Sequence, residues 1–491
     1  MKILNKIHIN HFFVILIFFS SFFSFNYNFL KVVKDSKFLT HSLLSEHMVV
    51  DGLINGKDIK GKIFLGRFTE DNDFFSHKTN QQVLKLRFDN ETKLKNIKNN
   101  LNGEFKKYYS QYGLQVEFFY LLKLIGIEDV NVYKSVSSLL MSIVVALLYF
   151  IISKKFSNKT AIIVSLSLIT SPLIVSLARN IYWLEFLWFL PILAGLMLGE
   201  KNYDTILLKC KFFLIFFLLF LIKMLCGYEY ISTIVISSII PFLIYISWDR
   251  KGFKQFINKS ILVFLSSIFA LIFSLVLQFY KFSDKQVSLK QNLNYMYQVI
   301  KIRTVFQDNQ SKEEFCRRRQ DLNKKEFNFE KFNDCIRSID KSDKINFLKV
   351  FIRYLMFNDF LPWVGNFSNF NENLESPEKS KDWLILKTIW QDINLKNLKK
   401  LYDIENQTKI DLLIIIINSM FFVSFVIYSF YKCSFRYKLV IFLSFLAKLS
   451  WIVLAYGHSS IHFTQNYVLW YLPLIPFCLI ALNYKNFKEI N

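Results

Sequence analysis

The sequence lacks the short motifs that mark metal centres and nucleic-acid-binding domains. Neither CxxC nor HExxH occurs among its six cysteines and seven histidines, so neither kind of zinc site is predicted. The net charge of +23 would suit a nucleic-acid-binding protein, but no motif for that function accompanies it. We therefore expect no nucleic-acid partner and assign the charge to membrane topology.

Glycine and proline are also scarce, at 13 and 7 of 491 residues, and no internal repeat is visible. Transporters tend to show inverted repeats and helices broken by these residues near the middle of the bilayer. A transporter or flippase of lipid-linked glycans is therefore kept only as an alternative.

Apolar residues, by contrast, are abundant. They make up 53% of the chain, which includes 55 Phe and has a mean hydropathy of +0.28, and the charged residues cluster between the apolar stretches. Soluble domains rarely reach such values because polar side chains must cover them. The stretch at 11–30 is longer than the apolar core of a signal peptide and lacks a cleavage site, so we expect an uncleaved first span.

Ten stretches have about the length that a membrane-spanning helix needs. They lie at 11–30, 134–152, 160–177, 181–198, 211–226, 231–247, 260–280, 411–430, 439–456 and 467–483. The predicted fold is an all-α polytopic membrane protein with about 10 transmembrane helices.

The short connections between these stretches differ in charge on the two sides. Those on one side all carry a net positive charge: 1–10, 153–159, 199–211, 248–259, 431–438 and 484–491. The only acidic or basic side chains counted in the opposite short connections are those of Arg179 and Glu229, whose charges cancel. Because Lys and Arg are enriched in cytoplasmic loops, both termini are predicted in the cytoplasm of a bacterial inner (plasma) membrane protein.

This topology divides the chain into three parts. Residues 1–280 form an N-terminal transmembrane module that includes the outer loop 31–133, residues 281–410 a mainly helical extracytoplasmic domain, and residues 411–491 a C-terminal module. Cys316 and Cys335, in the second loop, are either a disulfide or two free thiols. In the first loop, apolar residues from 38 to 50 predict a helix on the outer membrane surface that leads to a turn at Asp51-Gly52, and a second helix is expected at 116–125.

Ionisable groups inside or at the mouth of a bilayer are costly and are therefore candidates for function. Six occur in the outer half of the predicted bundle or at its surface: Arg179, Lys223, Glu229, Lys448, His458 and His462. The first loop adds Asp51, Glu70 and Asp71. Cations beside a carboxylate at a membrane surface suit an anionic lipid headgroup and acid/base chemistry.

Structural explanations compete with these functional ones. Lys223 would simply extend to the interface, Arg179 would bind lipid headgroups or pair with Glu185, and the two histidines would be ordinary interfacial residues. The nearby aromatic residues would form an interfacial belt rather than a sugar platform: Tyr182, Trp183, Tyr228, Tyr230, Tyr467 and Trp470.

The layout resembles the GT-C superfamily of polytopic glycosyltransferases, which use polyprenyl-phosphate-linked sugars. The resemblance rests on the span number, the helical first outer loop, an acid after the first span, best matched by Asp51 and next by Glu70-Asp71, and the segment Tyr109-Ser110-Gln111-Tyr112-Gly113 at the end of that loop. It implies that Asp51 is the general base of an inverting transfer to a glycan or lipid acceptor. Arg179, Lys223, Lys448, His458 and His462 would then stabilise the leaving phosphate.

The sequence itself indicates no cofactor. The resemblance implies a divalent cation, Mg or Mn, in those members that use one, and Glu229 would hold either this metal or a sugar hydroxyl. The alternative enzyme class is an O-antigen polymerase or ligase, which relies on Arg and His instead of a carboxylate. That class would fit the 281–410 loop, Arg179 and His458.

Overall fold

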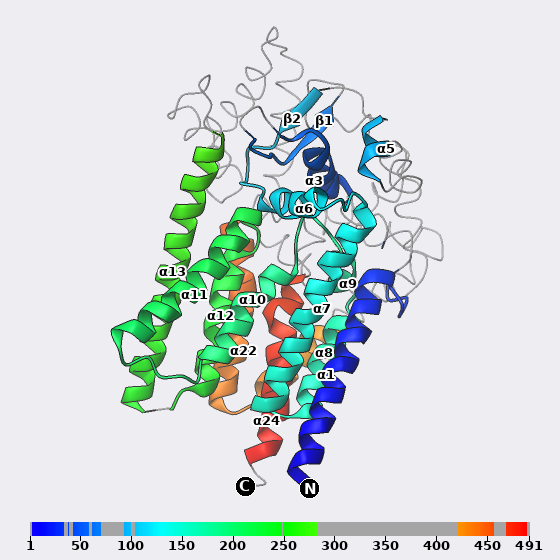
Figure 1. Cartoon of the computed structure of the whole chain (residues 1–491). Helices are drawn as coiled ribbons and strands as arrows, with labels where there is room; N and C mark the ends of the chain where they lie inside the picture. The colour runs from blue at the N-terminus through cyan, green and yellow to red at the C-terminus, as the bar shows by residue number, and fades with distance from the viewer. Residues whose placement is uncertain are drawn as a thin grey trace, which may run out of the picture.

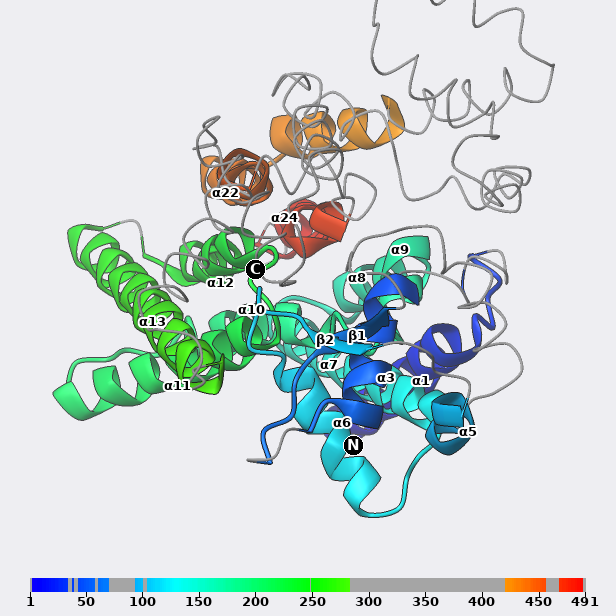
Figure 2. The ribbon, with the colours of Figure 1, turned by 90° about the horizontal axis from the view of Figure 1, so that it is seen from above.

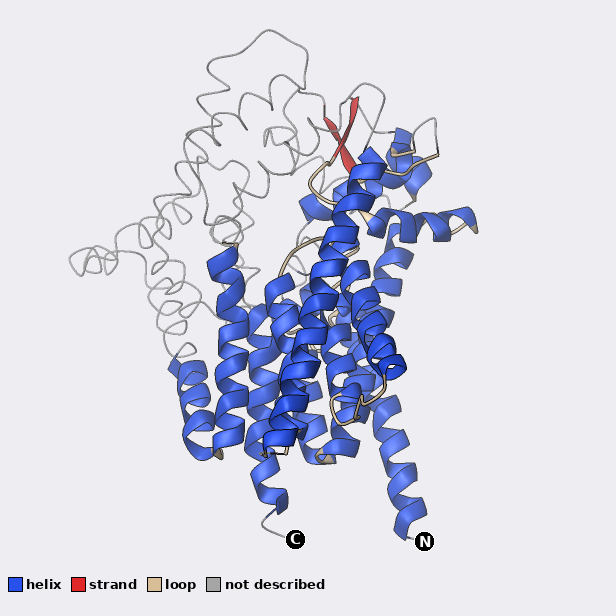
Figure 3. Cartoon of the chain, turned by 90° about the vertical axis from the view of Figure 1, so that its left-hand side faces the viewer, coloured by secondary structure: helices blue, strands red, loops and turns tan. Residues whose placement is uncertain are grey.

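The computed structural model describes residues 2–33, 38, 43–57, 61–69, 93–99, 104–247, 249–282, 420–455 and 468–488. This part of the chain is mostly helical, and its long helices run side by side in a bundle (Figures 1 and 3). The two termini lie at the same end of the bundle, and the described parts of the first long loop gather at the opposite end (Figure 1). We call this opposite end the loop end.

Each of the ten predicted stretches contains a helix. The helices of the bundle are α1 (Lys2–Tyr27), α7 (Val130–Lys155), α8 (Asn158–Ile169), α9 (Pro172–Ala178), α10 (Phe186–Leu198), α11 (Ile206–Cys226), α12 (Ile231–Tyr245), α13 (Arg250–Phe282), Met420–Lys432, α22 (Phe435–Leu454), η4 (Trp470–Leu474) and α24 (Ile475–Lys488). By length and composition α7, α13 and α22 are able to cross a membrane, and the bent pair α8–α9 would be a fourth span. The chain therefore has the character of a membrane protein.

The predicted span at 160–177 is not one straight helix. Its two halves, α8 and α9, meet at an angle of 71°. Ser171 caps α9 by accepting a hydrogen bond from the amide of Ile174 at 3.2 Å. Pro172 follows in the first turn, where the N–H that proline lacks is not needed. A Ser-Pro helix start inside the apolar stretch thus ends one helix and begins another.

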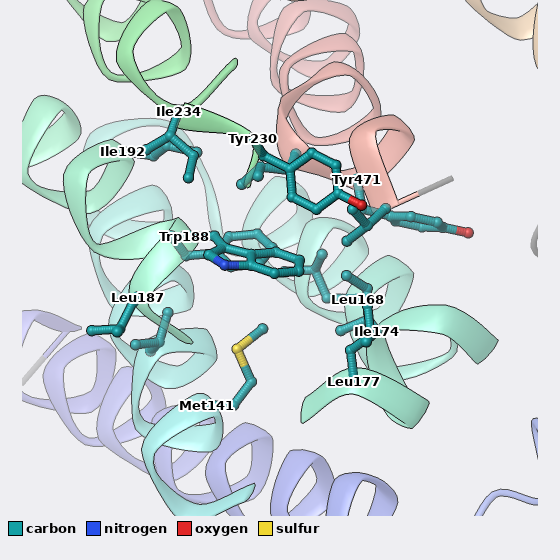
Figure 4. Close-up of a cluster of buried hydrophobic side chains, with 14 of the residues drawn as sticks. Met141, Leu168, Ile174, Leu177, Leu187, Trp188, Ile192, Tyr230, Ile234 and Tyr471 are labelled. Carbon is teal, nitrogen blue, oxygen red and sulfur yellow. The ribbon is translucent and has the colours of Figure 1, made fainter. Parts of the chain in front are cut away.

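Seen from the loop end, α11 and α13 form one side of the bundle and α1 and α7 another (Figure 2). α12 lies between α10 and α22 and contacts both. Gly195 permits the close approach of α10 to α12, because a Cβ atom there would lie 2.4 Å from the carbonyl oxygen of Ser238. Trp188 of α10 lies in the core among side chains of several helices, including Tyr230 and Tyr471 (Figure 4).

α13 begins with a capping arrangement at the end where the termini lie. The carboxylate of Asp249 accepts hydrogen bonds at 2.7 Å from the Ser247 hydroxyl and from the Gly252 amide. These two bonds lower the pKa of Asp249, in that order of importance. From there α13 runs to the loop end with many apolar side chains exposed, among them Phe269, Phe273 and Val276, as expected of a helix that faces lipid.

The first loop folds into a small unit at the loop end. Its elements are α3 (Leu43–Asn55), β1 (Gly66–Thr69), α5 (Leu94–Asn99), β2 (Glu104–Lys107) and α6 (Leu114–Leu124). β1 and β2 form an antiparallel pair in which Gly66 lies opposite Lys107. The prediction of an all-α fold therefore holds for the bundle but omitted this pair of strands.

The predicted turn at Asp51-Gly52 is wrong, because both residues lie inside α3. Glycine is needed there for packing, since a Cβ atom on Gly52 would lie 2.5 Å from the carbonyl oxygen of Phe64. α3 also buries Val49 and Val50 against the protein and does not present them to a membrane surface.

The helix predicted at 116–125 is confirmed as α6. Leu121 and Leu124 of α6, and Ile125 just after it, are exposed by 62%, 64% and 72%. The first two residues of the expected 281–410 domain end α13. The rest of that domain, including Cys316 and Cys335, lies outside the described residues.

Candidate functional site

A turn between α9 and α10 is held inside the loop end of the bundle. The side-chain oxygen of Asn180 accepts hydrogen bonds from the amides of Tyr182 and Trp183 at 2.9 and 3.0 Å. The hydroxyl of Ser137, on α7, donates to the carbonyl oxygens of Ala178 and Asn180 at 3.0 and 3.2 Å. Because this turn occupies 179–185, the predicted span at 181–198 begins as a helix only at Phe186.

Three buried charged side chains meet beside this turn. The carboxylate of Glu46, on α3, lies 2.8 Å from the ammonium of Lys134, on α7, and accepts the amide of Ile181 at 3.2 Å. The guanidinium of Arg179 lies 4.5 Å from the centre of the Phe38 ring. Burial lowers the pKa of Arg179, and the charge of Glu46 acts in the opposite direction. Two cations and one acid leave this cluster of three residues with a net positive charge.

A second buried ion pair lies where α11 ends. The ammonium of Lys223 donates to the carbonyl oxygen of Gly227 at 2.5 Å and lies 3.8 Å from the carboxylate of Glu229. Gly227 has a φ of 155°, and a Cβ atom on it would lie 2.2 Å from that carboxylate and 3.0 Å from the side-chain oxygen of Gln111. Lys223 therefore does not extend to the interface. Gln111 brings the end of the first loop, the segment that carries the family resemblance, to the same place.

Aromatic rings form a continuous row through this part of the core. Ring centres are 6.3 Å apart for Trp183 and Trp188, 5.0 Å for Trp188 and Tyr230, and 5.2 Å for Tyr230 and Trp451. Burial, then the charges of Glu229 and Glu185, raise the pKa of Tyr230 well above its ordinary value. The row thus lies near both acids and links the turn at 179–185 to the start of α12.

Four of the six aromatic residues predicted near the interface are consequently not a belt on the lipid-facing surface, and Tyr467 lies outside the described residues. Tyr182, Trp183, Tyr230 and Trp470 are all buried inside the protein. This removes the interfacial explanation for these four rings.

Several N–H donors in this region have no acceptor among the described residues. They belong to buried side chains: Gln111 Nε2, Arg179 Nε, Asn180 Nδ2, Trp183 Nε1 and Trp188 Nε1. A buried donor without an acceptor costs about 1–3 kcal/mol, so native structures rarely keep several together. Five donors suit a ligand rich in acceptor oxygens, such as a phosphate or a sugar.

Asp51 lies on a different side of α3 from Glu46. Asp51 comes five residues after Glu46. At about 100° per residue, its side chain therefore points about 140° around the helix axis from that of Glu46. The carboxylate of Asp51 is buried and accepts a hydrogen bond from the amide of Phe68, in β1, at 3.0 Å. His47, one turn earlier, is also buried and shares the Asp51 face of the helix.

Lys448 lies within the bundle on α22, one turn before Trp451. Its ammonium is 3.6 Å from the centre of the Trp470 ring and 5.0 Å from that of Phe445. The face of an aromatic ring attracts a cation, most strongly when both are desolvated. The sequence marked Lys448 as an ionisable group inside the bundle, and the structure places an indole ring against its ammonium.

The remaining predicted site residues, Glu70, Asp71, His458 and His462, lie outside the described residues.

Sequence reasoning missed Glu46, His47 and Lys134. A signal for each was present: Lys134 is a cation at the very start of an apolar stretch, and Glu46 and His47 stand among apolar residues at the spacing of a buried helix.

No group of three or more metal-binding side chains occurs within the described ranges. The carboxylate of Glu229 has a lysine beside it, an unfavourable neighbour for a divalent cation. The implied Mg or Mn therefore does not fit Glu229 in this arrangement.

Comparisons of the chain with protein-family models, with curated proteins and with solved structures found no match.

Proposed function

We propose that the protein is a membrane-embedded glycosyltransferase of the GT-C type. It would move a sugar from a polyprenyl-phosphate donor to a glycan or lipid acceptor at the extracytoplasmic face of a bacterial plasma membrane. The proposal rests on five buried N–H donors that have no acceptor within the described part of the chain and that lie next to two clusters of buried charge. A phosphate-linked sugar supplies both the acceptor oxygens and the negative charge that these groups lack.

Each cluster has a role in this proposal. Arg179, in the cluster of net positive charge, stabilises the phosphate as negative charge grows on it. Gln111 and Glu229 bind hydroxyl groups of the sugar, and Lys223 holds Glu229 in place. The rings of Trp183 and Trp188 provide an apolar surface with N–H groups at its edge.

The reaction itself requires a base for the acceptor. A carboxylate takes the proton of the acceptor hydroxyl while the oxygen attacks the anomeric carbon, and the bond from that carbon to the phosphate oxygen breaks with inversion. We propose Asp51 as the base on the ground of the family resemblance, since its carboxylate lies on a different side of α3 from Glu46 and the Arg179 cluster. Glu70 and Asp71 stay second candidates, and Lys448, His458 and His462 stay candidates for phosphate stabilisation.

The hydrogen bond from Phe68 makes Asp51→Asn an informative variant. Asparagine keeps a side-chain oxygen that can accept the Phe68 amide, but it cannot take up a proton at neutral pH. The variant should therefore fold and lose turnover by a factor of about 10²–10⁴. Asp51→Ala would lose the hydrogen bond as well and serves as the comparison for stability.

The test is transfer from purified polyprenyl-phosphate sugars by the wild type, Asp51→Asn and Glu70→Gln, with thermal unfolding measured on the same samples. Wild-type turnover together with a folded, inactive Asp51→Asn supports the proposal. A folded Asp51→Asn with full turnover excludes this residue as the base.

The second candidate is a polymerase or ligase of the O-antigen type. The specific observation in its favour is Arg179, buried beside Lys134 with its Nε donor unpaired among the described residues. That enzyme would be indifferent to Asp51→Asn and would lose activity in Arg179→Gln. A flippase would bind the lipid-linked sugar without forming a product.

A further inference from the structure

A cavity of about 420 Å³ lies at the corner between α6 and α13, on the outside of the bundle near the loop end. Its walls combine charged, aromatic and apolar side chains. Glu117 and Tyr120 come from α6, Tyr280 and Lys281 from α13, and Lys62 from the segment before β1. None of these five residues belongs to the buried donors or the charge clusters described above.

The polar wall is built around two lysines. Lys281 forms an ion pair with Glu117 at 2.7 Å and donates to the carbonyl oxygen of Tyr112 at 3.0 Å. The ammonium of Lys62 donates to the carbonyl oxygens of Tyr280 and Lys281 at 2.9 and 3.0 Å. Both cations are thus fixed at the end of α13, at the rim of the cavity.

Further lysines add positive charge to the same wall. Lys57 and Lys123 lie 5.8 and 6.0 Å from the centre of the Tyr120 ring. Two lysines therefore line the cavity and two more lie next to its Tyr120 side, and among the described lining residues only Glu117 carries a negative charge. The hydroxyl of Tyr112 lies 3.5 Å from Glu117, and burial, then this neighbour, raise the pKa of Tyr112 to about 12. The hydroxyl therefore stays protonated and able to donate.

The other wall is apolar and continues into two exposed apolar surfaces. Leu121 and Leu124 belong to the exposed side of α6, and Leu277 lies on α13 one residue after Val276, which is 54% exposed. Two helices that differ in direction thus present apolar side chains to the same surroundings, as expected where a surface helix meets a spanning helix.

We propose that this cavity binds an anionic phospholipid of the bilayer, with the phosphate between Lys62, Lys281 and Tyr112 and the acyl chains along Leu121 and Leu277. The charge of the wall selects a headgroup with net negative charge. The apolar wall selects an amphiphile over free phosphate. The proposal does not depend on the transferase activity, because it concerns different residues and is tested by binding.

The experiment is native mass spectrometry of the purified full-length protein, titrated with phosphatidylglycerol or with phosphatidylcholine. We expect tighter binding of phosphatidylglycerol, and Lys62→Gln should weaken it about fivefold. Lys57→Gln changes an exposed side chain next to Tyr120, so it should leave the fold intact and weaken binding, but less than Lys62→Gln does. Lys154→Gln changes an exposed lysine in the last turn of α7, far along that helix from the loop end, and is the matched control that should bind as the wild type does.

Three results would overturn the proposal. Equal affinity for the two lipids would show that the wall does not recognise negative charge. Equal binding by Lys62→Gln, Lys57→Gln and the Lys154→Gln control would place the lipid elsewhere. Displacement of phosphatidylglycerol by millimolar inorganic phosphate would assign the cavity to free phosphate.

Discussion

Replacement of Glu46 by glutamine should destabilise the protein strongly, because it leaves Lys134 and Arg179 buried without their acid. Glutamine has nearly the same shape and keeps an oxygen that can accept the amide of Ile181. The change therefore isolates the charge. Removal of one member of a buried ion pair typically costs about 3–5 kcal/mol, and a second cation nearby puts this case at the upper end of that range.

The chain offers a matched control at the other end of the bundle. Lys155 and Glu200 also form an ion pair, but their side chains are 30% and 59% exposed. Surface pairs contribute about 0–1 kcal/mol, so Glu200→Gln should be nearly neutral. The double variant Glu46→Gln with Lys134→Met should recover much of the lost stability, since it removes a buried charge together with its partner.

Thermal unfolding of the detergent-solubilised variants, followed by circular dichroism, would measure these differences. We expect a large fall in the unfolding temperature for Glu46→Gln, a partial recovery in the double variant and little change for Glu200→Gln. If Glu46→Gln unfolds at the same temperature as Glu200→Gln, the buried ion pair described at the loop end does not exist as such.

Three further predictions concern packing, pH and topology. Gly52→Ala should cost about 1–3 kcal/mol in unfolding free energy, because the new methyl group meets the Phe64 carbonyl oxygen; Ser45→Ala in the same helix should cost less. Asp249 has a lower pKa in the folded protein, so its carboxylate stabilises the fold only while it is ionised. The wild type should therefore be more stable than Asp249→Asn at neutral pH, and this difference should disappear as the pH falls below about 4. A difference that does not change with pH would refute the capping role. Cysteines introduced at 57 and 157 should react with impermeant reagents from outside and from the cytoplasm, respectively, and cytoplasmic labelling at 57 would overturn the topology.

The sequence predicted where the bundle helices lie, because a bilayer demands long apolar stretches and hydropathy records them directly. Hydropathy did not predict the bend at Ser171, because an apolar stretch looks the same whether it forms one helix or two. The signal in the sequence was Ser171-Pro172, a typical helix start. Gly52 was misread for a similar reason. A glycine often indicates a turn, but here it allows α3 to pack closely against the backbone of Phe64, a contact that the local sequence does not reveal.

The candidate site was predicted only in part. Arg179, Lys223 and Glu229 lie at or beside the ends of α9, α11 and α12, as expected of polar groups in or near short connections. Their partners could not be predicted, because Glu46, Lys134 and Gln111 reach the site through the fold of the first loop. Hydropathy carries no information on such long-range contacts.

The proposed function requires that the buried donors at the loop end bind a phosphate-linked sugar. Electron cryomicroscopy of the protein with a phosphonate analogue of a polyprenyl-phosphate sugar tests it most directly. We expect sugar density within hydrogen-bonding distance of the indole N–H of Trp183 or Trp188, with the phosphonate beside Arg179. Density for the sugar at the end where the termini lie, or away from all three of these side chains, would contradict it.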